Sequence, residues 1–159
     1  MTTLTLPALD PSTVEPYVGF DAYYPPPCRA PCSQREWRQL GDAAGLTQFG
    51  VNLVTLPPGS WSAQRHWHAN EDEFVFILEG EVVLVTDAGE QLLTAGMAAG
   101  FPTGRSDGHH LVNRSDRVVR LIEVGTRASS DEIEYPDVDM KLVVRNGAYR
   151  CMHKNGDPY

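Results

Sequence analysis

From residue 46 onward the chain consists of short apolar runs separated by turn-forming residues, and this pattern most restricts its fold. The runs cover residues 46–56, 62–68, 73–78, 82–86, 91–94, 109–113 and 118–125. Asp87-Ala88-Gly89-Glu90 and Arg114-Ser115-Asp116-Arg117 are typical of hairpin turns between strands. Because no long helical pattern interrupts these runs, the sequence predicts an all-β sandwich or small barrel.

The first 45 residues differ in composition from the rest of the chain. They hold seven of the twelve prolines together with Tyr17, Phe20, Tyr23 and Tyr24. Proline-rich sequence is excluded from long helices and central strands. We therefore expect residues 1–45 to form an arm that packs on a barrel of residues 46–145 or on a partner subunit, with 146–159 as a tail. Ser33-Gln34-Arg35-Glu36 fits a capping box and predicts a short helix to about Leu40.

Charge and hydropathy argue against nucleic-acid and membrane partners. Thirteen basic and twenty-one acidic residues give a net charge of −8, and no basic run is present. No apolar run approaches the roughly 20 residues that span a bilayer, and residues 1–7 lack the features of a signal peptide. We accordingly expect a cytoplasmic protein.

Three cysteines, Cys28, Cys32 and Cys151, are an odd number for a disulfide framework. We expect them to be reduced. Cys28 and Cys32 resemble half of a zinc site, for which Cys151 and His153 would have to supply the second half. We interpret them instead as a chance pair in a loop.

His66-Trp67-His68 is the strongest chemical signal in the sequence. On a β-strand alternate side chains share a face, so His66 and His68 point the same way, while Arg65 and Trp67 point the other way. Glu73 opens the next strand after a four-residue connection, and His109 must come from a distant strand. Glu71 and Asp72 are rival carboxylates, but Glu73 directly precedes the apolar strand.

Three imidazoles and one carboxylate suit one divalent transition metal, namely Fe, Mn, Ni, Zn, Co or Cu, rather than Ca or Mg. Four protein ligands leave two open positions on an octahedral ion, as a catalytic or ligand-capturing site requires. The alternative is that these histidines are merely hydrogen-bonded residues of the core or surface. The clustering of His66, His68, Glu73 and His109 favours the metal interpretation.

Two groups of residues resemble the two motifs of the cupin superfamily. The first group is Gly59, His66, His68, Glu73 and Gly80. The second is Gly96, Pro102, Gly104, His109 and Asn113, and fifteen residues separate the groups. Six residues between Gly59 and His66 are one more than is usual, and four between Gly104 and His109 exceed the common two. The second insertion leaves His110 as a rival ligand, but only His109 keeps the motif's spacing to Asn113.

The resemblance implies a double-stranded β-helix, which is a jelly-roll barrel with the metal inside one end, and a homodimer. The chain is similar to small single-domain cupins, some of which are labelled sugar-phosphate-isomerase-like. Cupins include dioxygenases, decarboxylases, lyases, isomerases, epimerases and plain ligand binders, so the fold alone does not define the activity.

Further residues are expected near the site. Gln64 shares the face of His66 and is a candidate for substrate contact or for support of the metal ligands. Phe101, Val75 and Ile77 are expected to line the cavity, and Arg105 lies in the enlarged loop at its mouth. We expect His110 to be packed or solvated, and Trp61 and Trp67 to pack on the outer face.

The function that these features favour is a metal-dependent enzyme acting on a small organic molecule by Lewis-acid or O2-activating chemistry. Glu73 is a possible base if it is not tightly ligated. Sugar-phosphate isomerisation is disfavoured because only Arg65 and Arg105 lie near the motifs. The alternative is a non-catalytic, metal-dependent binder or sensor of a sugar or small acid.

Overall fold

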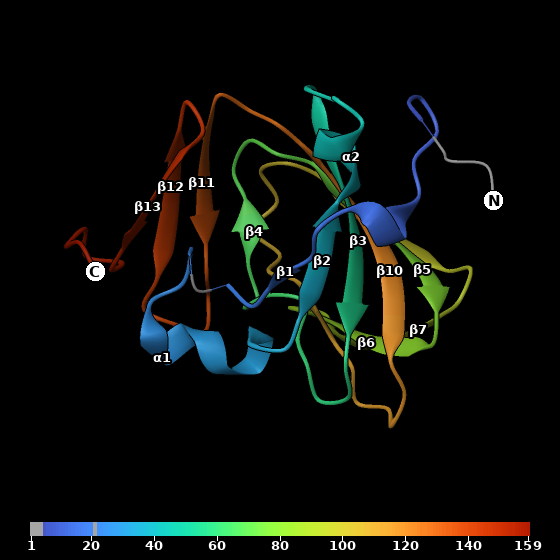
Figure 1. Ribbon diagram of the computed structural model, residues 1–159. Coiled ribbons are helices and arrows are strands. Elements are labelled where there is room, and N and C mark those ends of the chain that lie inside the picture. The colour runs from blue at the N-terminus through green and yellow to red at the C-terminus, as the bar shows by residue number, and fades with distance from the viewer. Residues whose placement is uncertain (1–4, 21) are drawn as a thin grey trace.

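The structure is a computed structural model that describes residues 5–20 and 22–159 (Figure 1). Residues 1–4 and Asp21 lie outside the described residues. They are part of the predicted arm, and residues 1–4 also belong to the segment expected to lack the features of a signal peptide. The strands are β1 Tyr17–Val18, β2 Glu36–Gln39, β3 Phe49–Leu56, β4 Trp67–His68, β5 Glu73–Glu79, β6 Glu81–Thr86, β7 Gly89–Thr94, β8 Ala98–Phe101, β9 His110–Val112, β10 Val119–Thr126, β11 Ser130–Glu134, β12 Lys141–Arg145 and β13 Ala148–Met152. The helical segments are short: η1 Pro11–Thr13, α1 Pro26–Arg29, η2 Ala30–Cys32 and α2 Leu40–Ala43.

The strands form antiparallel sheets that build a jelly-roll barrel, which confirms the predicted fold class. One sheet has the order β1-β2-β3-β10-β5-β8, a second β13-β12-β11-β4 and a third β7-β6-β9. Figure 1 shows β11, β12 and β13 on one side of the molecule and β3, β10 and β5 on the other, with β4 between them.

The core lies on the inner face of the six-stranded sheet, where side chains alternate in and out with a period of two. Val75 and Ile77 of β5 are buried, whereas the intervening Phe76 and the following Leu78 are exposed. The sequence placed Val75 and Ile77 in the cavity wall. Val75 does line the cavity, but Ile77 is fully buried in the apolar core.

A tight turn at Gly80 ends β5 and starts β6. Its φ is +84°, and a Cβ there would lie 3.0 Å from the Val118 carbonyl oxygen and 3.0 Å from Val119 Cγ2. Any other residue would be strained in this conformation and would clash with the neighbouring backbone.

Residues 33–36 do not open a helix, so that prediction is wrong. Glu36 begins β2, which pairs with β1 and with β3, and the helix α2 starts only at Leu40. Arg35 and Trp37 are both buried and alternate with the half-buried Glu36 and Arg38. Burial of Trp37 on the sheet, together with the strand hydrogen bonds, outweighs the local capping pattern.

The predicted strand over residues 62–68 is also shorter than expected. Only Trp67 and His68 form β4, which pairs with β11. Before β4, the strand-like pairing with the segment of His109 is limited to two isolated bridges. One joins Trp61 to Val112, and the other joins His66 to His109. This segment therefore joins the second sheet only at Trp67 and His68, and its residues before β4 bridge to the segment of β9.

Described parts of the predicted arm pack on the chain's own sheets. Tyr24, Cys28 and Cys32 are buried in one cluster with Tyr135 and Met140 and with other side chains of the second sheet. Residues 17–39 also add β1 and β2 to the six-stranded sheet. In the tail, β13 continues the second sheet beyond residue 145. Among the described residues no helix is long and apolar enough to cross a membrane.

Asn113 holds the turn between β9 and β10, and its side chain is fully buried. Its Nδ2 donates hydrogen bonds to the carbonyl oxygens of Leu56 (2.8 Å) and Arg117 (2.7 Å), while its Oδ1 accepts from the backbone N–H of Ser115 at 3.0 Å. The Asn of the second motif is thus explained by hydrogen bonding in the turn.

We predict that Asn113→Ala lowers the free energy of unfolding by about 2–4 kcal/mol, because two backbone carbonyls lose their donor. Urea unfolding measures this change. Asn155→Ala in the exposed tail is the control, with an expected change below about 0.5 kcal/mol. Equal stability of the two variants would refute this role of Asn113.

Candidate metal centre

Five strands position the predicted ligands. His68 ends β4, Glu73 begins β5, and Glu73 pairs with Gly125 of β10 and with Phe101 of β8. His109 directly precedes β9. His66 and His109 exchange two backbone hydrogen bonds, of 3.1 Å and 2.8 Å, which fix the first motif against the second.

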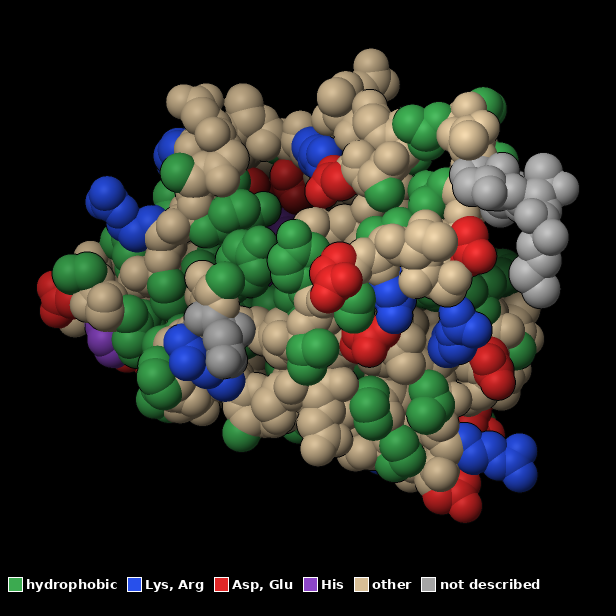
Figure 2. Space-filling model, in the orientation of Figure 1, with side chains coloured by type: hydrophobic (Ala, Val, Ile, Leu, Met, Phe, Trp, Pro, Cys, Tyr) green, Lys and Arg blue, Asp and Glu red, His purple; other side chains and the backbone are tan. Residues whose placement is uncertain are grey.

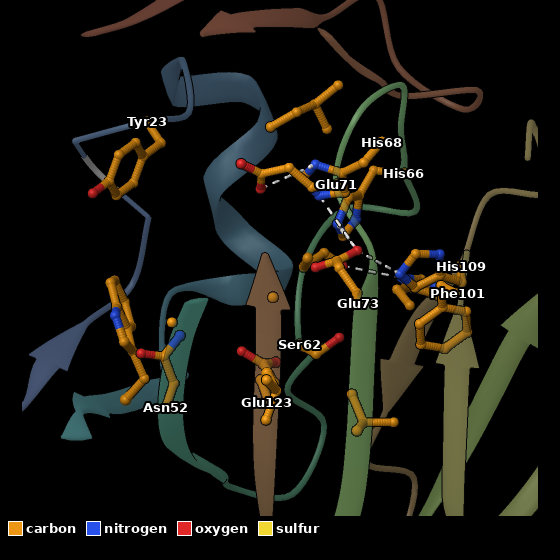
Figure 3. A pocket seen from close by; sticks show the side chains of 18 of the residues that line it. Tyr23, Asn52, Ser62, His66, His68, Glu71, Glu73, Phe101, His109 and Glu123 are labelled. Carbon is orange, nitrogen blue, oxygen red and sulfur yellow. Dashed lines mark hydrogen bonds and ion pairs between the residues drawn. The ribbon is translucent and has the colours of Figure 1, made fainter. Parts of the chain in front are cut away.

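The three imidazoles converge on one carboxylate oxygen (Figure 3). Glu73 Oε2 lies 3.0 Å from His109 Nε2, 3.3 Å from His68 Nε2 and 3.6 Å from His66 Nε2. The ligand atoms of His66, His68 and Glu73 all lie within 4.8 Å of one another. These three residues are close enough together for a single small cation. His109 is not part of this group, and it meets the centre through its 3.0 Å contact with Glu73 Oε2.

The donor set and its spacing fit a transition metal. With bonds of about 2.1 Å, neighbouring ligand atoms lie roughly 3.0 Å apart on an octahedral ion and roughly 3.4 Å apart on a tetrahedral one. The three separations from Glu73 Oε2 span these values. Imidazole nitrogen and carboxylate oxygen are also ligands that these metals prefer.

The far nitrogens of two imidazoles are held by hydrogen bonds that leave Nε2 facing the centre. His66 Nδ1 lies 2.8 Å from the backbone carbonyl oxygen of Gln64, and His68 Nδ1 lies 2.5 Å from Asp131 Oδ2. With Nδ1 as donor in each case, Nε2 carries the free lone pair. Such support of ligand imidazoles is common in metal sites.

His109 is oriented differently. Its ring stacks on Phe101, with centroids 3.5 Å apart and an interplanar angle of 2°. Its Nδ1 is buried without a hydrogen-bond partner among the described residues. Stacking on Phe101 therefore orients the imidazole of His109, whereas hydrogen bonds at Nδ1 orient the imidazoles of His66 and His68.

The half-buried carboxylate of Glu73 gives the site a negative charge that favours a cation. Burial raises the pKa of Glu73, but the hydrogen bond from His109 and the nearby imidazoles of His66 and His68 outweigh it and hold that pKa well below its usual range. Burial lowers the pKa of His109, which keeps its imidazole neutral. Burial also lowers the pKa of His68, but the Asp131 hydrogen bond and the nearby carboxylates outweigh this and raise it.

The cluster forms part of the wall of a cavity of about 300 Å³. His68, Glu71, Glu73, Phe101 and His109 also line a smaller cavity of about 70 Å³. The larger cavity is at the lower end of the range for small-molecule sites, roughly 300–1,000 Å³. It is lined by aromatic and polar side chains, including Tyr23, Trp37, Asn52, Glu123 and Tyr135.

Two of the predicted substrate residues reach the cavities. Phe101 lines both, while Arg105 lines only the smaller one, together with Asp107. Gln64 does not reach either. Its side-chain amide is buried and donates a hydrogen bond of 2.7 Å to the carbonyl oxygen of Cys28. It supports the centre through its backbone, which contacts His66.

Of the residues expected to point away from the cluster, Arg65 does so, whereas Trp67 lines the smaller cavity and His110 lines the larger one. Arg65 forms ion pairs with Asp137 and Asp87. His110 is buried and lies 3.1 Å through Nδ1 from the Ala63 carbonyl oxygen, and it contacts the indole of Trp61 edge-on. His110 also lines the large cavity, which alternation had not indicated.

Sequence reasoning missed several residues of the site. Asp131 is fully buried and binds His68, but it lies 63 positions away in the chain. The buried Arg35 and the half-buried Glu123 form an ion pair in the cavity wall, with Nη2 and Oε2 2.6 Å apart. One sequence feature could have identified Glu123: it is a single carboxylate at an inward position of an otherwise apolar strand.

The cysteines are free thiols in the described structure. Burial raises the pKa of Cys28 and of Cys151, and raises that of Cys32 to about 12. Among the described residues, the groups with metal-binding geometry contain no cysteine. Cys28 and Cys32 thus belong to the packing of the arm.

Comparison with known proteins agrees with this geometry. Residues 52–125 match the cupin domain. A solved sugar phosphate isomerase of the cupin superfamily from Silicibacter pomeroyi is 41% identical over 96% of this chain and 96% of that one, with a TM-score of 0.91. The chain belongs to the cupin superfamily, which confirms the resemblance of the two motifs.

More distant structures extend the likeness. A proposed sugar phosphate isomerase from Acidithiobacillus ferrooxidans is 27% identical over 79% of this chain and 80% of that one, with a TM-score of 0.72. A predicted oxalate decarboxylase from Thermotoga maritima is 20% identical over 76% and 99%, with a TM-score of 0.61, and shares the fold. No curated protein matches the chain.

We predict that Asp131→Asn weakens metal binding by about 10–100-fold, because the carboxylate that orients His68 is lost. Competition with a chromophoric chelator measures the affinity. Asp137→Asn, which removes a carboxylate from the outer ion pair with Arg65, serves as the control and is expected to bind like the unchanged protein. Equal affinities of the two variants would contradict the role given to Asp131.

Proposed function

We propose that this cupin is a metal-dependent enzyme that isomerises a small hydroxylated carbonyl compound. One observation carries the proposal: three imidazole Nε2 atoms converge on the Glu73 carboxylate at the wall of a cavity of about 300 Å³. A closed structural metal site would have no such cavity beside it.

In this proposal His66, His68, Glu73 and His109 hold one divalent ion among Fe, Mn, Ni, Zn, Co and Cu. Such an ion, when bound, polarises a carbonyl or hydroxyl oxygen as a Lewis acid, and iron would also make O2 chemistry available. Glu73 serves as ligand in this scheme and has no separate role as base. Phe101 keeps His109 in place, and Asp131 keeps His68 in place.

The cavity lining supports a sugar-like substrate. Asn52 and Glu123 offer hydrogen-bonding groups for hydroxyls, and Tyr23 and Trp37 offer aromatic faces. The relatives described as sugar phosphate isomerases support the same class.

The arginine side chains of the large cavity favour an unphosphorylated substrate, because carboxylates already pair with them. Among the described residues its lining includes two arginines, and each is paired with a carboxylate, Arg35 with Glu123 and Arg127 with Asp42. A phosphate would have to compete with those carboxylates. We therefore propose a free sugar or a related hydroxycarbonyl compound.

The first test is the metal content of purified protein. We expect about one transition-metal ion per chain, lost in His66→Ala and in His109→Ala because each removes a converging nitrogen. His153→Ala, which changes a histidine of the tail, is the matched control and is expected to retain the ion. Unchanged metal in both site variants would sink the proposal.

We also propose that the protein is a homodimer, as the family resemblance implies. Phe74, Phe76 and Leu78 lie on the outward face of β5 and are 44%, 37% and 46% exposed. A two-fold contact would bury the same apolar strip on both copies.

We predict that light scattering gives twice the chain mass of 17.6 kDa, and that Phe76→Arg yields the monomer by placing a charge in the contact. Leu92→Arg, on the exposed β7 of another sheet, is the control and is expected to remain dimeric. A monomeric unchanged protein would overturn the assignment.

The surface supports a small-molecule partner over a nucleic acid. Figure 2 shows basic side chains scattered among acidic ones on the face in view. The net charge of −8 adds to this pattern. Proteins that bind the phosphate backbone gather Lys and Arg on one face. We keep the cytoplasm as the proposed compartment, which the free cysteines support.

A further inference from the structure

We propose that Glu123 is the catalytic residue that moves the substrate proton, and that Arg35 is the positioning residue that holds its carboxylate. This inference rests on the proposed isomerase function and adds to it a proton-transfer group outside the metal ligands. Neither residue belongs to the two cupin motifs.

The sheet register places Glu123 beside the metal centre. On β10, Val119, Leu121 and Glu123 share the inward face, and the first two are fully buried in the apolar core. Glu123 stands opposite Val75 of β5, while Glu73 stands opposite Gly125. Diagonal neighbours across antiparallel strands lie roughly 7–8 Å apart at their Cα atoms. A small molecule that reaches the metal ligands therefore also reaches Glu123 (Figure 3).

The carboxylate of Glu123 is held from the side of the arm. Arg35 Nη2 lies 2.6 Å from Glu123 Oε2, and the side chain of Arg35 is only 4% exposed. Its guanidinium lies over the rings of Phe20 (4.7 Å) and Trp37 (4.6 Å). Arg35 Nε is buried without a hydrogen-bond partner among the described residues. A cation buried at this cost, against a carboxylate in a cavity wall, indicates a functional use.

The surroundings keep Glu123 able to take up and release a proton. Burial raises its pKa, the charge of Arg35 opposes that rise, and the charge of Glu73 adds to it while that of His66 opposes it. A carboxyl with a raised pKa is a better base than an exposed one, and it remains a competent acid after protonation.

Other groups in the cavity are less suited to the task. Glu71 accepts a hydrogen bond from the Ala128 backbone N–H and lies 3.9 Å from His68 Nδ1, so it belongs to the support of the centre. Burial holds the pKa of Tyr135 well above its ordinary value. Its phenol therefore donates hydrogen bonds at neutral pH and does not act as a base.

The proposed step conserves atoms and electrons. The Glu123 carboxylate takes the proton from the carbon next to the substrate carbonyl, and the C–H electron pair becomes the C=C bond of an enediolate. The carbonyl π pair moves to its oxygen. Glu123 returns the proton to the former carbonyl carbon, and the hydroxyl proton moves between the two oxygens. The substrate is isomerised, and no external oxidant or reductant takes part.

The test compares Glu123→Gln with the unchanged protein on five- and six-carbon aldoses, free and phosphorylated, in D2O. NMR follows both the aldose–ketose conversion and deuterium at the exchanging carbon. We expect Glu123→Gln to lose about 100-fold or more of the conversion rate while keeping its full metal content. Glu81→Gln, an exposed carboxylate on β6, is the control and should convert at the unchanged rate. Glu123→Asp should recover part of the rate. If Glu123→Gln does not fold, Glu123→Asp replaces it in the comparison.

Each outcome has a distinct meaning. Conversion by Glu123→Gln within about three-fold of the unchanged protein, with metal retained, overturns the role of Glu123 and leaves the proposed function standing. No conversion of any sugar by the unchanged, metal-loaded protein overturns the isomerase function and this inference with it. Sugar binding without conversion then identifies a binder.

Arg35 is tested by a pH profile, which a purely structural role would not displace. Its positive charge lowers the pKa of Glu123, so Arg35→Met should raise that pKa. The basic form of Glu123 is then lost at a higher pH. The acid limb of the conversion rate should move up by roughly one pH unit, and Arg35→Lys should restore most of the shift. An unmoved acid limb in Arg35→Met contradicts the positioning role.

Discussion

Two backbone hydrogen bonds between His66 and His109 hold the centre together, because they join the residues directly before β4 and β9, which lie 43 positions apart. Strand β4 is only two residues long, so this bridge sets the direction of the histidine pair more than any extended ladder does. Once it forms, Glu73 reaches all three imidazoles from the start of β5. The charge of that half-buried carboxylate then makes the site favourable for a cation.

The arm completes the cavity that the barrel leaves open. Arg35, directly before β2, and Trp37 on β2 line the cavity, and Tyr23 and Tyr24 extend the same wall. Aromatic stacking of Phe20 on Trp37, with centroids 5.3 Å apart, fixes this wall to the sheet. The barrel and the arm thus contribute different parts of the proposed site. The barrel positions the proposed metal ligands, and the arm shapes the cavity in which a substrate would lie.

The parts of the site that the sequence predicts are those governed by local rules. Alternation along a strand and short turns suffice to place His66, His68 and Glu73 together, and family spacing adds His109. The sequence does not predict the positions of Arg35, Glu123 and Asp131 in the site. These positions depend on which strands become neighbours, and local patterns do not contain that information. The capping pattern at residues 33–36 misled because sheet pairing of Glu36 and burial of Trp37 outweigh a local helix signal.

The central claim is that one metal ion lies among His66, His68, Glu73 and His109. Anomalous diffraction from crystals grown with Mn²⁺ tests it directly. The account predicts a single anomalous peak bonded to the three Nε2 atoms and to Glu73. The absence of a peak there, or a peak held instead by the neighbouring group of His68 Nδ1, Glu71 and Asp131, would contradict it.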